Sequence, residues 1–216
     1  MFQAMFRKQA LLLLGLIAPL LVPPCFAEEG FTSLFNGKDL SGWKVNENPQ
    51  SFSVSEGAIV AHGPRSHCFY VGDFQNHLFK NFELRVDVKT RPKANGGIYF
   101  HTEFQEQGWP GKGFEAQVNN TYPGDPRLTG SLYEVADVGS SVAKDDEWFT
   151  ESVLVQGMSV TIKVNGETVA QWTQPPDWKG TADFPNRRIG TGTIALQSHD
   201  ANSTVYYKNI RIRLMN

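Results

Sequence analysis

The stretch Phe82-Glu-Leu-Arg-Val-Asp-Val-Lys89 shows most clearly what kind of fold this chain adopts. Apolar residues occupy every second position from Phe82 to Val88, and charged residues occupy the positions between them. A strict period of two is typical of a β-strand that buries one face and leaves the other in water. The stretch therefore predicts a strand in a sheet that has one solvated face.

A second stretch predicts a tight antiparallel hairpin. Val160-Thr-Ile-Lys-Val164 is followed by Asn165-Gly166 and then by a β-rich run from Glu167 to Trp172. Asn-Gly tolerates positive φ at both central positions, which favours the two-residue turn whose twist matches the flanking strands. The closing run Ser203–Leu214 shifts its apolar parity between Tyr207 and Ile210, which predicts a bulge near Lys208-Asn209.

The rest of the chain repeats this pattern of short β-rich runs. Its 20 glycines and 12 prolines fall between such runs, and helical periodicity is almost absent. This arrangement is typical of a sandwich built from strands alone. We therefore expect an all-β fold.

Three further segments differ from Phe82–Lys89 in what their second face carries. They are Asn95-Gly-Gly-Ile-Tyr-Phe-His101, Phe114-Glu-Ala-Gln-Val-Asn119 and Ile194-Ala-Leu-Gln-Ser-His199. In each segment, the side chains that point to one face of the expected strand are apolar. The opposite face holds side chains that carry protons, bind hydroxyl groups or ligate metals: Tyr99, His101, Glu115, Gln117, Asn119, Gln197 and His199. We expect the three strands to share one sheet with a polyhydroxyl-binding or catalytic floor; a hydrated face rich in amides and imidazoles is the alternative.

Three irregular segments adjoin these strands. Gln105–Gly113 carries Trp109-Pro-Gly111 at its tip, Tyr122–Gly130 is rich in Pro, Gly and Asp, and Gln174–Arg188 precedes the strand with Gln197. Long loops that leave a functional face usually form the rim of its site. We expect these segments to surround the polar floor.

The first 27 residues have the pattern of an export signal. Arg7 and Lys8 form a basic start, the apolar run from Leu11 to Val22 is short for a membrane span, and Cys25-Phe-Ala27 marks a cut before Glu28. We therefore expect residues 1–27 to be a signal peptide. Residues 28–216 then form one domain, exported to the periplasm or the cell exterior. Acylation of Cys25 as a lipoprotein is the alternative, which the preceding Pro23-Pro24 disfavours.

Composition narrows the possible partners. The formal net charge is −2, and it becomes −4 without Arg7 and Lys8, so we expect no nucleic-acid partner. After residue 27 no apolar run is long enough to cross a membrane. Cys68 is the one cysteine after the expected cut, so the domain is expected to fold without an internal disulfide.

Several segments together resemble one known family, the 3-keto-disaccharide hydrolases, over nearly all of residues 28–216. Phe31-Thr-Ser-Leu-Phe-Asn-Gly-Lys-Asp-Leu-Ser-Gly-Trp43 is similar to the opening of that family. The other matching segments are Asn95-Gly-Gly-Ile98, Phe114-Glu-Ala-Gln117, Thr129-Gly-Ser-Leu-Tyr133, Val164-Asn-Gly166, Leu196-Gln-Ser-His199 and Lys208-Asn-Ile-Arg-Ile-Arg213. The chain departs from the family in Gln197-Ser-His-Asp200, where many members read Q-D-H-G, and in the insertion Gln105–Gly113.

The resemblance implies a concanavalin A-like jelly-roll sandwich of two antiparallel sheets in an exported protein. It also implies a hydrolase or lyase that acts on glycosides oxidised at C3 of a glucose-type ring. A C3 ketone acidifies the hydrogen at C2, so a base can remove it and the C1 substituent can be eliminated. Such chemistry needs a proton acceptor near neutrality, stabilisation of the enolate oxygen and an acid for the leaving group.

The residues of the polar floor provide candidates for each role. We expect Glu115, His199 and His101 to be catalytic, with the imidazoles carrying protons and Glu115 acting as base, metal ligand or orienting partner. The expected substrate-binding residues donate hydrogen bonds or stack on a sugar: Tyr99, Gln117, Asn119, Tyr133, Gln197 and Trp109. A structural histidine at a sheet edge is the alternative for each imidazole, and His62, His67 and His77 are expected to be structural or exposed.

No cofactor is certain from the sequence. His101, Glu115 and His199 could form a divalent-metal site with two imidazoles and one carboxylate, although no close spacing supports it. Two other functions remain open on the same fold. A non-catalytic carbohydrate-binding module would carry a floor dominated by aromatic rings. A laminarinase-type glycosidase would carry a second carboxylate on the strand of Glu115, where Gln117 stands.

Overall fold

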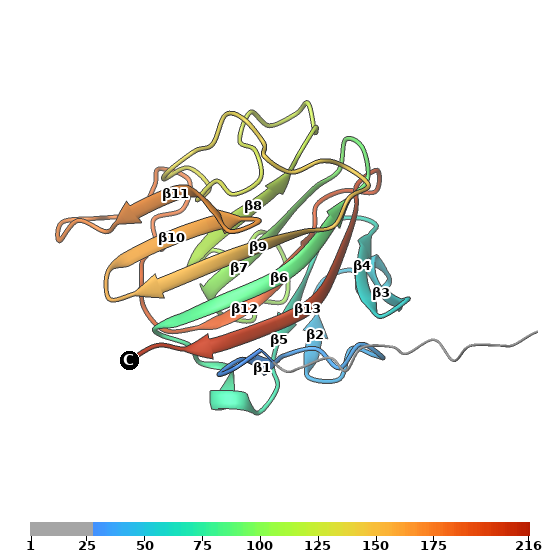
Figure 1. Cartoon of the computed structure of the whole chain (residues 1–216), viewed down its shortest axis with the longest axis horizontal. Helices are drawn as coiled ribbons and strands as arrows, with labels where there is room; N and C mark the ends of the chain where they lie inside the picture. Colours follow the sequence, from blue (N-terminus) through green and yellow to red (C-terminus); the bar gives the residue numbers. More distant parts are fainter. Residues whose placement is uncertain (1–27) are drawn as a thin grey trace, which may run out of the picture.

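A computed structural model describes residues 28–216, and the expected signal peptide with Cys25 lies outside these residues. The described chain is built from strands in two antiparallel sheets, with two short 3₁₀ helices, η1 (Pro49–Ser51) and η2 (Phe74–His77). Figure 1 shows the larger sheet in front of the smaller one. The expected all-β sandwich is confirmed.

The larger sheet has eight strands. Its order is β11-β10-β9-β6-β13-β4-β3, and β1 also pairs with β13. The bounds are β1 Thr32–Ser33, β3 Phe52–Ser55, β4 Ala58–His62, β6 Phe82–Thr90, β9 Phe149–Gln156, β10 Ser159–Val164, β11 Glu167–Thr173 and β13 Thr204–Leu214.

The smaller sheet has five strands in the order β2-β5-β12-β7-β8. The bounds are β2 Trp43–Val45, β5 Ser66–Tyr70, β7 Asn95–Thr102, β8 Phe114–Asn119 and β12 Thr193–Ser198. The three strands with polar second faces, β7, β8 and β12, are therefore neighbours, as expected.

The core lies between the two sheets and follows the alternation of the sequence. In β6, Phe82, Leu84, Val86 and Val88 are fully buried, and the charged residues between them are half-buried on the outer face. From the smaller sheet, Ile98, Phe114 and Leu196 join the same apolar cluster. Apolar side chains removed from water contribute about 25 cal/mol per Å² to folding, so this cluster is the main source of stability.

Two local predictions are confirmed by the strand register. Asn165 and Gly166 both have positive φ, 50° and 84°, and connect Val164 to Glu167 in the β10–β11 hairpin. The pairing of β13 with β6 shifts between Lys208 and Arg211, which places the expected bulge in the middle of β13.

Glu151 is an exception on the core side of β9. Its side chain is buried, and neither carboxyl oxygen has a hydrogen-bond partner among the described residues. The Gly130 N–H would favour an ionised Glu151, but it donates to the carbonyl of Gln117. Burial raises the pKa of Glu151 well above its usual value, which favours a neutral carboxyl in the core.

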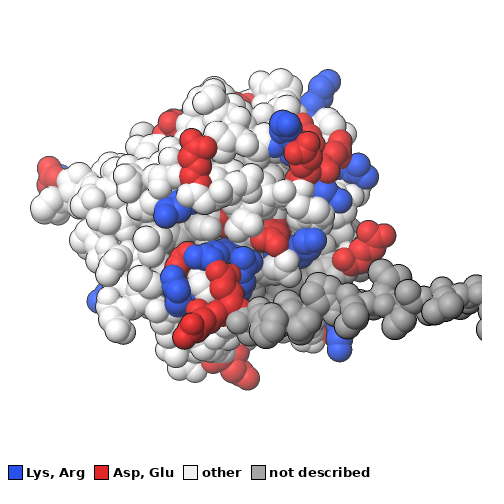
Figure 2. All heavy atoms as spheres, viewed as in Figure 1, with Lys and Arg blue, Asp and Glu red and all other residues white. Residues whose placement is uncertain are grey.

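The outer face of the larger sheet carries both basic and acidic side chains. Basic and acidic side chains gather together where β6 and β13 lie (Figure 2). They form ion pairs between Arg85 and Glu83, between Arg213 and Glu83, and between Arg211 and Glu28. The arginines of this face are therefore paired with neighbouring carboxylates.

Two further properties concern the domain as a whole. Within residues 28–216 no helix is long and apolar enough to pass through a membrane. Cys68 is a buried, free cysteine in β5.

Candidate active site

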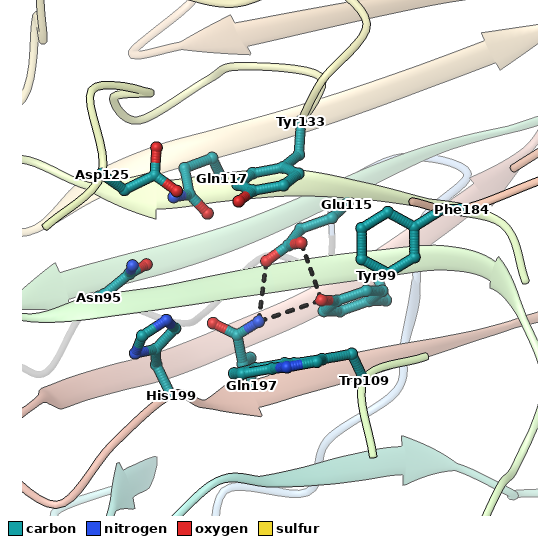
Figure 3. A pocket seen from close by; sticks show the side chains of 10 residues that line it. All are labelled: Asn95, Tyr99, Trp109, Glu115, Gln117, Asp125, Tyr133, Phe184, Gln197 and His199. Carbon is teal, nitrogen blue, oxygen red and sulfur yellow. Dashed lines mark hydrogen bonds between the residues drawn. The ribbon is translucent and has the colours of Figure 1, made fainter. Parts of the chain in front are cut away.

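A pocket of about 180 Å³ lies on the outer face of the smaller sheet, over β7, β8 and β12. The loops at Trp109, Asp125 and Phe184 form its rim, so each of the three irregular segments contributes to it. Figure 3 shows the side chains that line it: Asn95, Tyr99, Trp109, Glu115, Gln117, Asp125, Tyr133, Phe184, Gln197 and His199.

A buried hydrogen-bond network forms the floor. The Tyr99 hydroxyl donates to Glu115 Oε2 at 2.8 Å, and Gln197 Nε2 donates to Glu115 Oε1 at 2.9 Å and to the Tyr99 hydroxyl at 3.1 Å (Figure 3). The pairing of β7 with β8 places Tyr99 directly opposite Glu115. Gly97 leaves the space for the carboxyl, because a Cβ there would lie 2.3 Å from Glu115 Oε1.

Glu115 titrates in the neutral range. It is 4 % exposed, and burial raises the pKa of its carboxyl to about 7. The positive charge of Arg187 and the hydrogen bonds from Tyr99 and Gln197 oppose this shift without overcoming it. A carboxyl that exchanges a proton near pH 7 is suited to general acid–base catalysis.

Arg187 is the charge partner of Glu115. Its Nη2 lies 3.7 Å from Glu115 Oε2, its Nη1 donates to the Tyr133 carbonyl, and its side chain is 1 % exposed. The guanidinium also lies 3.9 Å from the centre of the Phe184 ring. Arg187 therefore connects the rim segment 174–188 to the floor of the pocket.

His199 lines the pocket just beyond the end of β12. Its Nδ1 is hydrogen-bonded to Asp200 Oδ2 at 2.8 Å, which leaves Nε2 for the pocket. The rings of Trp109 and Tyr122 flank the imidazole with centroid distances of 5.3 and 5.4 Å. Asp200 therefore orients the imidazole through Nδ1, and two aromatic rings pack beside it.

Three amides of the pocket have polar atoms without a partner in residues 28–216. They are Gln117 Nε2, Gln197 Oε1 and Asn95 Oδ1, all on side chains that are at most 2 % exposed. An unpaired buried amide atom costs about 1–3 kcal/mol, so such atoms in a pocket are suited to binding a polar ligand or water. One donor and two acceptors match the hydroxyl and carbonyl groups of a sugar.

The family of the chain follows from a match over residues 30–213 to the model described as "3-keto-alpha-glucoside-1,2-lyase-like domain". The chain belongs to this family. It is also 25% identical over 231 residues to the 3-keto-disaccharide hydrolase of Bacteroides thetaiotaomicron, covering 87% of this chain and 79% of that protein.

Solved structures confirm the fold. A candidate glycosyl hydrolase from Parabacteroides distasonis matches with a TM-score of 0.73 and 29% identity, covering 87% of this chain and 95% of that one. A carbohydrate-binding module, CBM66 of Bacillus subtilis, matches at 10% identity with a TM-score of 0.58 over 80% and 95% of the two chains, which shows the fold alone. The expected jelly-roll sandwich is confirmed for this member of the 3-keto-alpha-glucoside-1,2-lyase-like family.

His101 does not join the pocket of this family member, contrary to our expectation. It has a φ of 53°, and the pairing of β7 with β12 skips it, since Phe100 pairs with Ile194 and Thr102 with Thr193. The bulge breaks the alternation from which its direction was predicted. The imidazole instead packs against Phe82 and Phe100 at the end of the core.

The hydrogen bonds of His101 fit a structural role. The Gly190 N–H donates to Nδ1, so Nε2 carries the proton and donates to the Lys80 carbonyl at 2.9 Å. Burial lowers the pKa of this imidazole to about 4, so it is neutral at pH 7. Both ring nitrogens are engaged by backbone groups, which leaves neither for a substrate.

Asn119 points to the same face of β8 as Glu115 and Gln117, but its side chain forms hydrogen bonds to a rim loop. Its Nδ2 donates to the carbonyls of Asp125 and Arg127, and its Oδ1 accepts from the Tyr122 N–H. The side chain is fully buried and these contacts use both ends of its amide. We expected Asn119 to bind substrate, and the structure instead gives it the role of holding segment 122–130 in place.

Tyr133 and Trp109 line the pocket as expected. Tyr133 is positioned because residues 129–133 pair with the open edge of β8: its N–H donates to the Glu115 carbonyl, and the Gly130 N–H donates to the Gln117 carbonyl. Burial raises the pKa of the Tyr133 hydroxyl to about 12, so it remains a hydrogen-bond donor at neutral pH.

The sequence did not single out several residues near the site. Asn95, Asp125 and Phe184 line the pocket, and Arg187 supports Glu115. Their positions depend on how the loops fold back over the sheet, which no alternation pattern reports.

His67 was expected to be structural or exposed. It is fully buried in β5, its ring 5.6 Å from that of Trp109 and 5.2 Å from that of Tyr99.

The three-residue metal site considered from the sequence is not formed in residues 28–216. No group of three or more His, Cys, Asp or Glu side chains among them is arranged to hold a metal ion. His101 faces the core end, and the Glu115 oxygens already accept from Tyr99 and Gln197. The donor set therefore fits proton transfer better than metal ligation.

Proposed function

We propose that this protein is an exported enzyme that cleaves 3-keto-glucosides or 3-keto-disaccharides by C2 deprotonation and elimination. The proposal is supported by the family match and by the name of the Bacteroides thetaiotaomicron relative. The observation that carries it is the pocket itself. One carboxyl with a pKa of about 7 and one oriented imidazole line a floor whose amides have unpaired polar atoms.

The proposed reaction is an elimination followed by the addition of water. A base removes the hydrogen at C2 as a proton, and the C–H electron pair forms an enolate with the C3 oxygen. The enolate then expels the C1 substituent with the electrons of the C1–O bond, which gives a C1=C2 double bond and restores the ketone. The leaving oxygen takes a proton from an acid. Addition of water, with OH to C1 and a proton to C2, completes a net hydrolysis.

The pocket residues provide a group for each of these steps. In our proposal His199 accepts the C2 proton through Nε2, since Nδ1 is used by Asp200. Gln117 Nε2, the buried donor without a partner, donates a hydrogen bond to the C3 oxygen as negative charge develops there. Glu115 supplies the proton for the leaving group, because its carboxyl is partly protonated near pH 7.

An ordinary glycosidase mechanism has one observation in its favour, since Asp125 lines the same pocket as Glu115. Such a mechanism needs two carboxyl groups that flank the scissile bond. Asp125 Oδ1, however, accepts from the Arg127 N–H and faces Arg127 Nη1 at 3.2 Å, so this second carboxylate is already paired. These contacts favour the elimination mechanism.

The proposal is tested by incubating the purified protein with a 3-keto-glucoside and with its unoxidised parent. We expect cleavage of the oxidised glucoside alone, because the parent lacks the ketone that acidifies C2. Glu115→Gln and His199→Ala should each lower kcat by about 10²–10⁴-fold. His77→Ala, a histidine of η2 outside the pocket, is the matched control and should keep full activity.

Two outcomes would contradict the proposal. Cleavage of both glucosides at similar rates would favour an ordinary glycosidase. Binding of a 3-keto-glucoside without cleavage would favour a carbohydrate-binding module.

Export is the second part of the proposal. It is supported by the basic and apolar pattern of residues 1–27. We expect protein recovered outside the cytoplasm to begin at about Glu28 on N-terminal sequencing. A lipid-modified Cys25 at the N-terminus would contradict the signal peptide and establish the lipoprotein alternative.

A further inference from the structure

Building on the proposed function, we propose that Asp200 is a positioning residue that fixes the tautomer of His199 and so presents Nε2 as the basic nitrogen of the site. The residue is adjacent to His199 in sequence and does not line the pocket. Its effect on the reaction would therefore pass entirely through the imidazole.

The turn after β12 brings the carboxyl of Asp200 back to its neighbour. Asp200 Oδ1 accepts the N–H groups of Asn202 and Ser203 at 2.8 and 3.1 Å. Asp200 Oδ2 accepts from the Ser203 hydroxyl at 2.9 Å and contacts His199 Nδ1 at 2.8 Å. The carboxyl is thus held by its own turn, with one oxygen directed at the imidazole.

An ionised carboxylate only accepts hydrogen bonds, so the shared proton belongs to Nδ1. Burial opposes ionisation of Asp200, but the hydrogen bonds from His199, Asn202 and Ser203 outweigh burial and lower the pKa of the carboxyl. In neutral His199 the Nε2 atom then carries a lone pair toward the pocket. A carboxylate of this kind also stabilises the imidazolium that forms when Nε2 takes a proton.

The ring cannot easily turn to exchange its nitrogens. Trp109 and Tyr122 pack beside it, with interplanar angles of 38° and 63°. Other titratable groups near it come from different elements: Glu115 of β8, Asp125 and Tyr133 line the same pocket, and the neutral imidazole of His67 in β5 contacts Trp109. Among these groups, Asp200 is the one that is hydrogen-bonded to the imidazole.

The decisive variant is Asp200→Asn. Its carbonyl oxygen can still accept the two turn N–H groups, so the turn is kept. Its NH₂ group then faces Nδ1, which must become an acceptor, and the proton moves to Nε2. We expect kcat on a 3-keto-glucoside to fall about 10²–10⁴-fold with a much smaller change in KM. Asp39→Asn is the matched control, because Asp39 makes a similar turn contact with the Ser41 N–H and does not line the pocket.

Nitrogen-15 NMR of the imidazoles tests the inference independently of turnover. Wild-type His199 is expected to carry its proton on Nδ1, and the Asp200→Asn variant on Nε2. A merely structural role for Asp200 would lower stability without this exchange of nitrogens. The double variant His199→Ala, Asp200→Asn should be no slower than His199→Ala alone, because both changes act through one imidazole.

Two results would overturn the inference. One is a wild-type His199 whose proton is on Nε2, and the other is an Asp200→Asn variant with kcat within about twofold of wild type. If instead the wild type fails to cleave the 3-keto-glucoside, the proposed function fails. The NMR result still decides whether Asp200 sets the tautomer.

Discussion

At the scale of single residues, the site depends on buried polar groups, which destabilise the fold unless they are paired. The Glu115 carboxyl is stabilised by Tyr99, Gln197 and the charge of Arg187, yet burial still raises its pKa to about 7. Removing one member of a buried ion pair typically costs about 3–5 kcal/mol, because the other charge stays buried. The protonation state of Glu115 is therefore tied to Arg187.

A first prediction concerns Arg187→Met. Loss of the guanidinium removes a charge that lowers the pKa of Glu115, so that pKa rises further. A carboxyl whose folded pKa is raised stabilises the fold at low pH and loses this contribution as pH rises through the folded pKa. We expect Arg187→Met to destabilise the protein by about 3 kcal/mol at pH 8, measured by urea unfolding, and by less at pH 5.

Arg188→Met is the matched control for this prediction. Arg188 is exposed, and its Nη1 donates to the Trp178 carbonyl rather than to a buried carboxylate. Its loss should change stability by less than about 1 kcal/mol at either pH. An equal penalty for Arg187→Met at pH 5 and pH 8 would show that Glu115 does not titrate as described.

At the scale of elements, strand β7 lies between the core and the pocket, and its two adjacent glycines face opposite sides. A Cβ on Gly96 would lie 2.7 Å from the Tyr207 hydroxyl and 3.0 Å from Val205 Cγ2, both in the core. A Cβ on Gly97 would lie 2.3 Å from Glu115 Oε1 in the pocket. The same substitution at the two positions therefore affects opposite faces of one strand.

A second prediction follows from this pair. Gly97→Ala should displace the Glu115 carboxyl and lower kcat by at least about tenfold, while costing less stability than Gly96→Ala. Gly96→Ala should overpack the core and destabilise the protein by about 1–3 kcal/mol. Thermal unfolding and turnover of a 3-keto-glucoside, measured on both variants, separate the two effects. Equal losses of activity and stability in both would contradict the assignment of the faces.

The strands and their faces could be predicted from the sequence because alternation directly reports which side of a strand is buried. The outward direction of Tyr99, Glu115, Gln117 and Gln197 follows from it. His101 was predicted wrongly, because a bulge with a positive φ reverses the direction that alternation assigns.

The rest of the pocket depends on contacts between residues distant in the chain. Arg187 reaches Glu115 only after segment 174–188 folds over the sheet, and the buried position of His67 depends on the covering Trp109 loop. No local pattern in the sequence marks either contact.

At the scale of the whole molecule, two buried histidines should set the acid limit of stability. Burial lowers the pKa of His67 to about 3 and that of His101 to about 4. The unfolded chain binds protons at these residues near their ordinary pKa of about 6.5, and the folded chain does not. Their contribution to stability is therefore present above about pH 6.5 and is lost as pH falls toward 4.

A third prediction tests this pH dependence. His67→Gln should make the free energy of unfolding fall less steeply between pH 6.5 and pH 4, because the variant has one fewer group that protonates only on unfolding. The wild-type protein provides the slope for comparison. Urea unfolding across this pH range gives both slopes. An unchanged slope in His67→Gln would mean that His67 is accessible to protons in the folded state.

The central claim, cleavage through removal of the C2 hydrogen, is tested most directly with a 3-keto-glucoside deuterated at C2. The wild-type protein is incubated with it in ordinary water, and a sample without protein measures spontaneous exchange. We predict that each cleaved molecule loses its C2 deuterium, as mass spectrometry of the released 3-keto sugar would show, and that His199→Ala abolishes both cleavage and deuterium loss above background. Cleavage by the wild type with the C2 deuterium fully retained would contradict the account.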